Sequence, residues 1–225
     1  MKSTLFIAGA LLFSCAQASV IFYGGDAAPR GVMESDILLD TWVFDDFDIS
    51  APSAIQNLWG NFFLTAGTTT GAAWEIRSDI SSGDSGTLIA SGSGAVTLTP
   101  TGRTLASFPE DQVMISGLNI VLNPGRYFMA IAVSGEDARG SLAITNGGDI
   151  NTSGDPNPAP TGGPIFNGDS FVRSPGNNFV PADIYYGSPG TRFDGSYGVG
   201  GAVPEPATIL GFLVGLAALA ARRRQ

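Results

Sequence analysis

Three residue types are nearly missing from this sequence. The chain of 225 residues contains one cysteine, Cys15, and no histidine. Its only lysine is Lys2, so the stretch from Ser19 to Pro204 has no cysteine, histidine or lysine. These absences exclude a disulfide framework, a Ser-His-Asp triad, a Cys-His pair, a Ser-Lys dyad and an ordinary zinc site there. An enzyme built from this stretch would depend on paired carboxyl groups, as glycosidases do.

Positive charge is also scarce. Between Ser19 and Pro204, seven arginines stand against 19 acidic residues, a net charge of −12, and the whole chain carries −9. This charge repels nucleic acid phosphates, so we expect no nucleic acid partner. About 185 residues are enough for one buried core, which predicts a single domain over residues 19–200.

The N-terminus has the features of a signal peptide. A positive charge is followed by an apolar run at 5–13 and by small residues ending at Ala18. This pattern predicts export by the Sec route, a signal helix within residues 1–18 and cleavage by signal peptidase between Ala18 and Ser19. A competing interpretation is a lipoprotein box at 12–15, but its bulky phenylalanine argues against lipidation.

The region between the two ends is predicted to be all-β. Apolar and polar residues alternate in short runs between Gly- and Pro-rich turns, and no window shows sustained helical periodicity. This pattern predicts an antiparallel β-sandwich or jelly-roll ectodomain, with a long loop at 146–164. The expected strands are 41–49, 54–64, 73–79, 87–92, 96–99, 112–122, 126–133 and 141–145, with weaker ones around 171, 183–186 and 192–199.

Two local patterns make more detailed predictions. Within 41–49 the apolar phase shifts by one residue after Phe44, which predicts a β-bulge. Asn123-Pro124-Gly125 separates two apolar runs and predicts that these runs pair as a β-hairpin.

The densest acidic cluster contains the candidate metal ligands. Asp45, Asp46 and Asp48 follow closely on one another, and oxygen-rich sites at the rim of a β-sandwich hold Ca²⁺ in many proteins. These three residues are therefore the candidate calcium ligands. A solvated acidic surface explains the cluster equally well, and we predict no catalytic residue and no other cofactor.

Aromatic residues divide into two groups. The three tryptophans lie in apolar strands and are predicted to pack in the core. Tyrosines in polar surroundings are better candidates to stack on sugar rings: Tyr185, Tyr186 and Tyr197.

The C-terminus combines two prolines, an apolar stretch and a basic end. Residues 207–221 carry no charge and would form a helix of roughly 22 Å, shorter than the roughly 30 Å hydrocarbon core of a bilayer. The arginines at 222–224 would stay on the cytoplasmic side, leaving the domain outside. Physical chemistry alone is compatible with a short membrane anchor that stays in place.

The segment 201–225 closely resembles the PEP-CTERM sorting signal of Gram-negative envelope proteins, a segment also labelled as the ice-binding protein C-terminal domain. The matching positions are Val203, Pro204, Glu205 and Pro206, the hydrophobic stretch 207–221, and Arg222, Arg223 and Arg224. The resemblance implies a transient single-pass helix in the inner membrane and cleavage by an exosortase near Pro-Glu-Pro. The product would reach the cell envelope, the outer surface or the extracellular space of a bacterium that makes exopolysaccharide and biofilm.

A second resemblance covers the domain itself. Residues 73–103, 116–133 and 167–184 are similar to a recurring family of secreted bacterial β-domains without an established activity. This resemblance implies fold and secretion only.

Three functional hypotheses follow. The first is a non-enzymatic surface or extracellular matrix protein associated with exopolysaccharide or biofilm. The second is a carbohydrate-binding module with a defined glycan site, and the third is a secreted glycosidase that uses two carboxyl groups.

Overall fold

The fold is built almost entirely from antiparallel β-strands, which confirms the predicted all-β class. The computed structural model describes residues 19–176 and 178–202; the predicted signal helix and the predicted C-terminal helix lie outside them. In chain order the elements are β1 (Ser19–Tyr23), β2 (Ala27–Glu34), β3 (Trp42–Ile49), β4 (Ser53–Ser78), β5 (Thr87–Ala95), β6 (Thr97–Leu105), β7 (Phe108–Leu122), β8 (Gly125–Thr145), β9 (Phe171–Ser174), β10 (Asn178–Pro181), α1 (Ala182–Tyr185), β11 (Asp194–Gly195) and β12 (Tyr197–Ala202).

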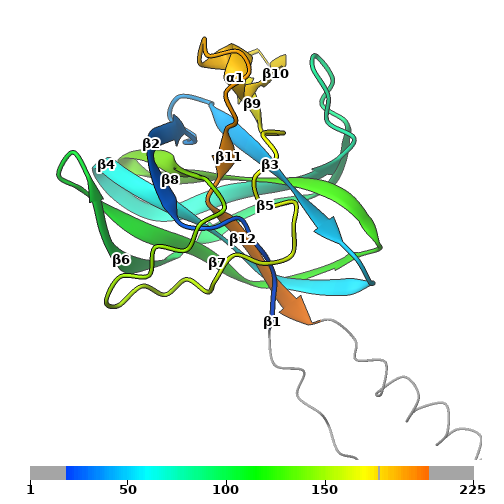
Figure 1. Cartoon of the computed structure of the whole chain (residues 1–225), viewed down its shortest axis with the longest axis horizontal. Coiled ribbons are helices and arrows are strands. Elements are labelled where there is room, and N and C mark those ends of the chain that lie inside the picture. Colours follow the sequence, from blue (N-terminus) through cyan, green and yellow to red (C-terminus); the bar gives the residue numbers. More distant parts are fainter. Residues whose placement is uncertain (1–18, 177, 203–225) are drawn as a thin grey trace, which may run out of the picture.

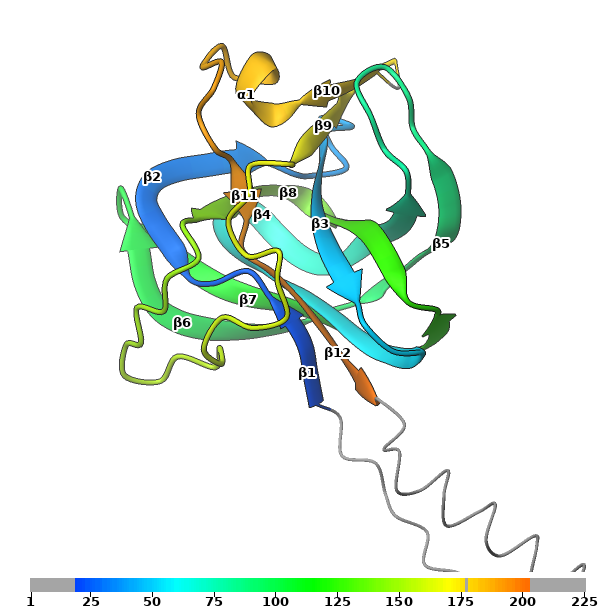
Figure 2. The same cartoon turned by 45° about the vertical axis from the view of Figure 1, so that its right-hand side comes forward.

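The strands form one sheet of 12 strands that curls over on itself (Figures 1 and 2). The long strand β4 takes part in both halves of the curl. Its residues 53–63 pair with β7 and residues 54–60 with β12, whereas residues 62–77 pair with β8 and residues 71–78 with β5. The register between β4 and β8 shifts repeatedly between Leu64 and Gly71, and such irregularities let a strand bend.

The main apolar core lies inside the curled sheet. It includes Leu58 and Phe62 of β4 and Ile131 of β8, which are all fully buried. A second apolar cluster covers the other face of β3, where Trp42 and Phe44 pack with residues of β8 and β10. Apolar packing therefore covers both faces of β3.

The predicted bulge in β3 is wrong. β3 keeps a continuous register with β9 and then with β8. Regular alternation directs Val43 and Phe47 into the main core and Trp42 and Phe44 into the second cluster. The change of apolar phase therefore marks a strand that is covered on both faces.

The predicted hairpin is also wrong, although the predicted turn is present. β7 ends at Leu122 and β8 begins at Gly125, so the chain reverses at the expected place. Within the described residues, however, both strands pair with β4 and not with each other. A turn sequence determines where the chain reverses, but the pairing depends on long-range contacts that it does not contain.

Two further segments test the sequence predictions. The loop 146–164 contains no helix or named strand, as predicted, and is tied to β1 by a bridge between Thr161 and Tyr23. The weak strand predicted at 183–186 is wrong, because residues 182–185 form the single helical turn α1.

The first and last strands lie side by side. Ser19 of β1 pairs with Gly201 of β12 in antiparallel register, so both ends of the domain lie at the same pole, away from α1, β9 and β10 (Figures 1 and 2). No helix within the described residues is long and apolar enough to cross a membrane. The stretch 207–221, for which a membrane helix was predicted, lies outside those residues.

Candidate functional site

Three buried carboxyl groups meet near the junction of β3 and β11. Asp45 and Asp46 lie in the middle of β3, and Asp194 begins β11. Each residue offers a carboxylate oxygen, and these oxygens lie within 4.8 Å of one another. All three residues are 2–3% exposed. Three oxygen ligands of the kind that Ca²⁺ prefers therefore converge on one point.

The loop before β9 and the start of β11 hold this acidic group in place. The donors are Ser170 Oγ at 2.7 Å and Gly195 N at 2.8 Å to Asp45, Asn167 Nδ2 at 3.1 Å to Asp46, and Gly168 N at 3.0 Å to Asp194. A carboxylate has about four acceptor positions. The contacts with these donors therefore orient the oxygens and leave lone pairs for a cation.

Burial raises the pKa of all three carboxyl groups. Desolvation is the main cause at Asp45, whose pKa lies well above its ordinary value of 3.8, and the charges of Asp194 and Asp46 raise it further. Desolvation also raises the pKa of Asp46 to about 6, although Asn167 and Arg126 oppose the shift. Burial likewise raises the pKa of Asp194. The group therefore favours uptake of protons or of a cation.

Asp48, the third candidate ligand, lies apart from this group. Its side chain is 45% exposed and accepts a hydrogen bond from Arg126 Nε at 3.1 Å. Arg126 also lies 3.4 Å from Asp46. The structure thus brings together Asp45, Asp46 and Asp194. Asp194 does not stand out in the sequence, because an Asp before a glycine indicates only a turn.

A second buried polar cluster surrounds Arg103 of β6. Its guanidinium pairs with Asp26 at 3.2 Å and also with Glu110 and Asp155. The Arg103 side chain is only 9% exposed. Burial raises the pKa of Glu110, although Arg103 opposes this shift. The cluster places one cation among three carboxyl groups.

Neutral side chains extend the Arg103 cluster beneath the loop 146–164. Their hydrogen bonds run from Tyr23 to Asp26 at 2.7 Å, from Asn61 to Tyr23 at 2.9 Å, from Gln112 to Asn157 at 2.9 Å, and from Asn157 to Asp26 at 3.3 Å. Because Asp155 and Asn157 belong to the loop, these contacts bind it to the sheet. These contacts stabilise the fold, and they hold in place the two prolines on either side of Asn157.

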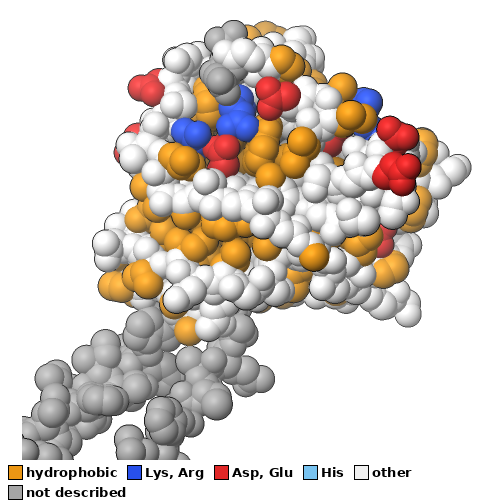
Figure 3. Space-filling model, turned by 180° about the vertical axis from the view of Figure 1, so that it is seen from behind, with side chains coloured by type: hydrophobic (Ala, Val, Ile, Leu, Met, Phe, Trp, Pro, Cys, Tyr) orange, Lys and Arg blue, Asp and Glu red, His pale blue; other side chains and the backbone are white. Residues whose placement is uncertain are grey.

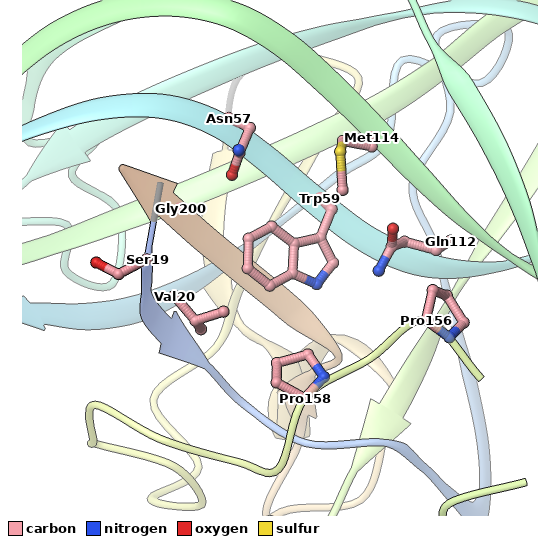
Figure 4. A pocket seen from close by; sticks show the side chains of 9 residues that line it. All are labelled: Ser19, Val20, Asn57, Trp59, Gln112, Met114, Pro156, Pro158 and Gly200. Atoms are coloured by element: carbon pink, nitrogen blue, oxygen red, sulfur yellow. The ribbon is translucent and has the colours of Figure 1, made fainter. Parts of the chain in front are cut away.

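These prolines cover a small pocket beside Trp59 of β4. The pocket has a volume of about 150 Å³ and is lined by Ser19, Val20, Asn57, Trp59, Gln112, Met114, Pro156, Pro158 and Gly200. Figure 4 shows the indole of Trp59 between the amide side chains of Asn57 and Gln112. None of the lining side chains is charged. These side chains are therefore suited to a small, uncharged molecule.

The aromatic predictions have mixed outcomes. All three tryptophans are buried, as predicted, but Trp59 lies outside both apolar clusters. Tyr197 is fully buried and its hydroxyl group donates to the carbonyl of Val43 at 3.0 Å, so it is excluded as a stacking residue. Tyr185 is 40% exposed and stays a candidate.

The surface carries little charge on the face shown in Figure 3. There the basic side chains lie beside acidic ones, and hydrophobic side chains gather in a band. Among the described residues, Glu75 pairs with both Arg77 at 2.6 Å and Arg173 at 2.8 Å. Paired arginines offer little free positive charge to a polyanion.

Comparison with known proteins identifies the C-terminus. The described residues form a β-domain whose strand β12 ends at Ala202, at the start of the C-terminal segment. A family model described as the PEP-CTERM protein-sorting motif matches residues 202–224. The chain is therefore a PEP-CTERM sorting-signal protein, exported to the cell envelope or surface as an exosortase substrate. No curated protein and no solved structure matches the chain.

Proposed function

We propose that the protein is a non-enzymatic component of the cell surface or extracellular matrix that associates with exopolysaccharide or biofilm. The observation that carries this proposal is the junction between β12 and the sorting motif. β12 ends at Ala202, and the match to the motif begins at the same residue. Cleavage near Pro204–Pro206 would therefore leave every strand pair of the domain intact and release a complete β-domain outside the cell.

The delivery route forms part of the same proposal. Sec exports the chain, signal peptidase cleaves between Ala18 and Ser19, and the helix at 207–221 holds the protein in the inner membrane until the exosortase acts. Because β1 and β12 are neighbours, both tethers would leave the same pole. The opposite pole would face away from the membrane.

The processing prediction is tested by the intact mass of the native protein. In cells that contain the exosortase we expect a species that begins at Ser19 and ends near Pro204. Without the enzyme, or in a variant with Glu205→Ala, we expect the species that ends at Gln225 to accumulate in the membrane. A protein that ends at Gln225 in both strains would show a permanent anchor and contradict the proposal.

The contacts of the glutamates favour a non-enzymatic role over a glycosidase. A glycosidase needs two carboxyl groups roughly 5–10 Å apart across an open groove. Glu75 is bound by two arginines, and Glu110 is buried against Arg103. Both therefore have structural partners. The second candidate function, a carbohydrate-binding module, is favoured by the pocket beside Trp59.

Calcium remains part of the proposal, with Asp45, Asp46 and Asp194 as ligands. A divalent cation would offset the buried negative charge of this group, near which, within the described residues, Arg126 and Arg192 supply positive charge. Bound calcium would fix β3 to β11 and to the loop before β9. Its role would be to stabilise the fold.

The calcium proposal predicts that Asp46→Asn is more stable than the native protein without calcium but, unlike the native protein, is not stabilised by added calcium. The pKa of Asp46 is raised to about 6 in the folded state, so its contribution to stability is greatest at low pH and is lost as pH rises through about 6. At pH 7.5 with chelator, the variant should therefore be more stable than the native protein, by roughly 1 kcal/mol after allowance for screening. Calcium at about 100 times its Kd should raise the native Tm by about 5–10 °C and leave the variant unchanged.

Asp48→Asn is the matched control for this experiment, because Asp48 lies on the same strand but outside the carboxylate group. Its Tm should respond to calcium as the native Tm does. At pH 4.5, protons should compete with calcium and remove most of the response. The absence of a calcium response in the native protein at pH 7.5 would refute the proposal.

A further inference from the structure

The pocket beside Trp59 contains polar atoms that lack partners. The indole Nε1 of Trp59 and the side-chain oxygen of Asn57 are both buried without a hydrogen-bond partner among the described residues. Trp59 itself is only 4% exposed. Buried polar groups are nearly always satisfied in folded proteins. A ligand that supplies the missing partners is therefore favoured at this position.

The two atoms have complementary requirements. Nε1 of Trp59 is a donor, and the oxygen of Asn57 is an acceptor. Hydroxyl groups fulfil both roles, because each one donates once and also accepts. The apolar lining supplied by Val20, Met114 and Pro158 suits C–H surfaces between such groups. Several hydroxyl groups on an apolar carbon framework, without charge, are the chemistry of a neutral sugar.

The size of the pocket limits the ligand to one ring. The pocket volume is about 150 Å³. Pockets for drug-sized ligands are larger, at about 300–1,000 Å³. The pocket therefore has room for at most one sugar residue, with the rest of a polymer outside.

Two glycines of β12 create room for the polar side chains. A Cβ on Gly198 would lie 2.0 Å from Cε2 of Trp59, and a Cβ on Gly200 would lie 2.0 Å from the side-chain oxygen of Asn57. On the opposite side, the hydrogen bond from Gln112 to Asn157 holds the covering loop. Both walls are thus fixed before a ligand arrives, which lowers the entropic cost of binding.

We infer that this pocket binds one uncharged sugar residue of the exopolysaccharide, with Trp59 Nε1 donating to, and the side-chain oxygen of Asn57 accepting from, the sugar's hydroxyl groups. This inference rests on the proposed association with exopolysaccharide and assigns it to a site. The pocket adjoins Ser19 and Gly200, so the bound polymer lies at the pole from which the sorting segment leaves.

The indole signals of the three tryptophans provide the test. ¹⁵N-labelled, processed protein is titrated with glucose, galactose, mannose, N-acetylglucosamine and glucuronate, and the indole N–H resonances are followed. At least one neutral sugar should shift the Trp59 signal saturably, while those of Trp42 and Trp74 stay in place. Trp59→Phe removes the donor and should weaken binding about tenfold, followed on backbone signals.

Trp42→Phe is the control, since Trp42 lies in the second apolar cluster, and it should bind as the native protein does. If Trp59→Phe fails to fold, Asn57→Ala removes the acceptor and should weaken binding similarly. The inference is overturned if no neutral sugar moves the Trp59 signal, if only glucuronate moves it, or if both pocket variants bind normally.

Sedimentation with the native exopolysaccharide separates this inference from the proposed function. Protein that sediments with the polymer but shows no shift at Trp59 would refute the pocket assignment and leave the association intact. A shift at Trp59 without sedimentation would refute the association and leave the sugar site intact.

Discussion

Replacement of Arg103 by methionine is expected to lower the free energy of unfolding by about 3–5 kcal/mol, the usual effect of removing one partner from a buried ion pair. Methionine retains most of the apolar stem of arginine but lacks the guanidinium. The variant would leave Asp26, Glu110 and Asp155 without the cation that pairs with all three. Urea unfolding of the purified protein measures the loss. Domains are stable by about 5–15 kcal/mol, so this is a large fraction of the total.

Arg192→Met is the matched control for Arg103→Met. Arg192 is exposed and donates to the carbonyl of Phe166 at 3.2 Å, so its replacement should cost less than about 1 kcal/mol. Adding Glu110→Gln to Arg103→Met should recover part of the loss, because one buried charge fewer lacks compensation. Equal losses for the two arginine variants would contradict the assigned role of the network.

Gly198→Ala is expected to cause the second-largest loss of stability, about 1–3 kcal/mol from overpacking. The added Cβ would lie 2.0 Å from the indole of Trp59, and Trp59 is buried between β12 and the loop 146–164. A rigid ring at this position cannot yield without displacing β12 or the loop. The same change should move the indole N–H resonance of Trp59, which reports directly on the pocket.

Gly94→Ala tests whether the effect belongs to the pocket or to strand glycines in general. Gly94 also lies in a strand, β5, but a Cβ there would meet no atom within 4 Å. This variant should be neutral or slightly stabilising, because alanine restricts the unfolded chain. A loss at Gly94 equal to that at Gly198 would mean that backbone preference, and not contact with Trp59, decides the outcome.

Features that depend on neighbouring residues were predictable from the sequence. Alternation predicts strands because side chains in a strand point to opposite faces, and the all-β class is confirmed. The position of the turn at Asn123-Pro124-Gly125 and the loop 146–164 follow from local backbone preferences. The PEP-CTERM motif was recognisable because it depends on a linear order of residues, which the family match at 202–224 confirms.

Which strands pair with each other was not predictable from such local patterns. β7 and β8 are neighbours in sequence, yet both pair with β4. The alternation in β3 indicated a bulge, because nothing local shows that a second apolar cluster covers its other face. The residue pattern of a strand shows which of its faces are buried, but it does not show which segment covers each face.

In the candidate sites, too, some residues stand out in the sequence and others come together only on folding. Asp45 and Asp46 stand out locally as acidic residues in an apolar strand. Asp194 joins them only when β11 lies beside β3, and Asn57 and Trp59 become a pocket only when Pro156 and Pro158 cover them.

By itself, the sequence determined the fold class, the negative charge, the excluded chemistries and the C-terminal sorting motif, because each depends on composition or on residues close together in the chain. Only the tertiary structure decided which carboxyl groups converge, that Arg103 holds the long loop, and that the N–H of Trp59 lies in a pocket without a partner among the described residues. These features depend on contacts between segments far apart in the sequence, and such contacts arise only when the curled sheet brings those segments together.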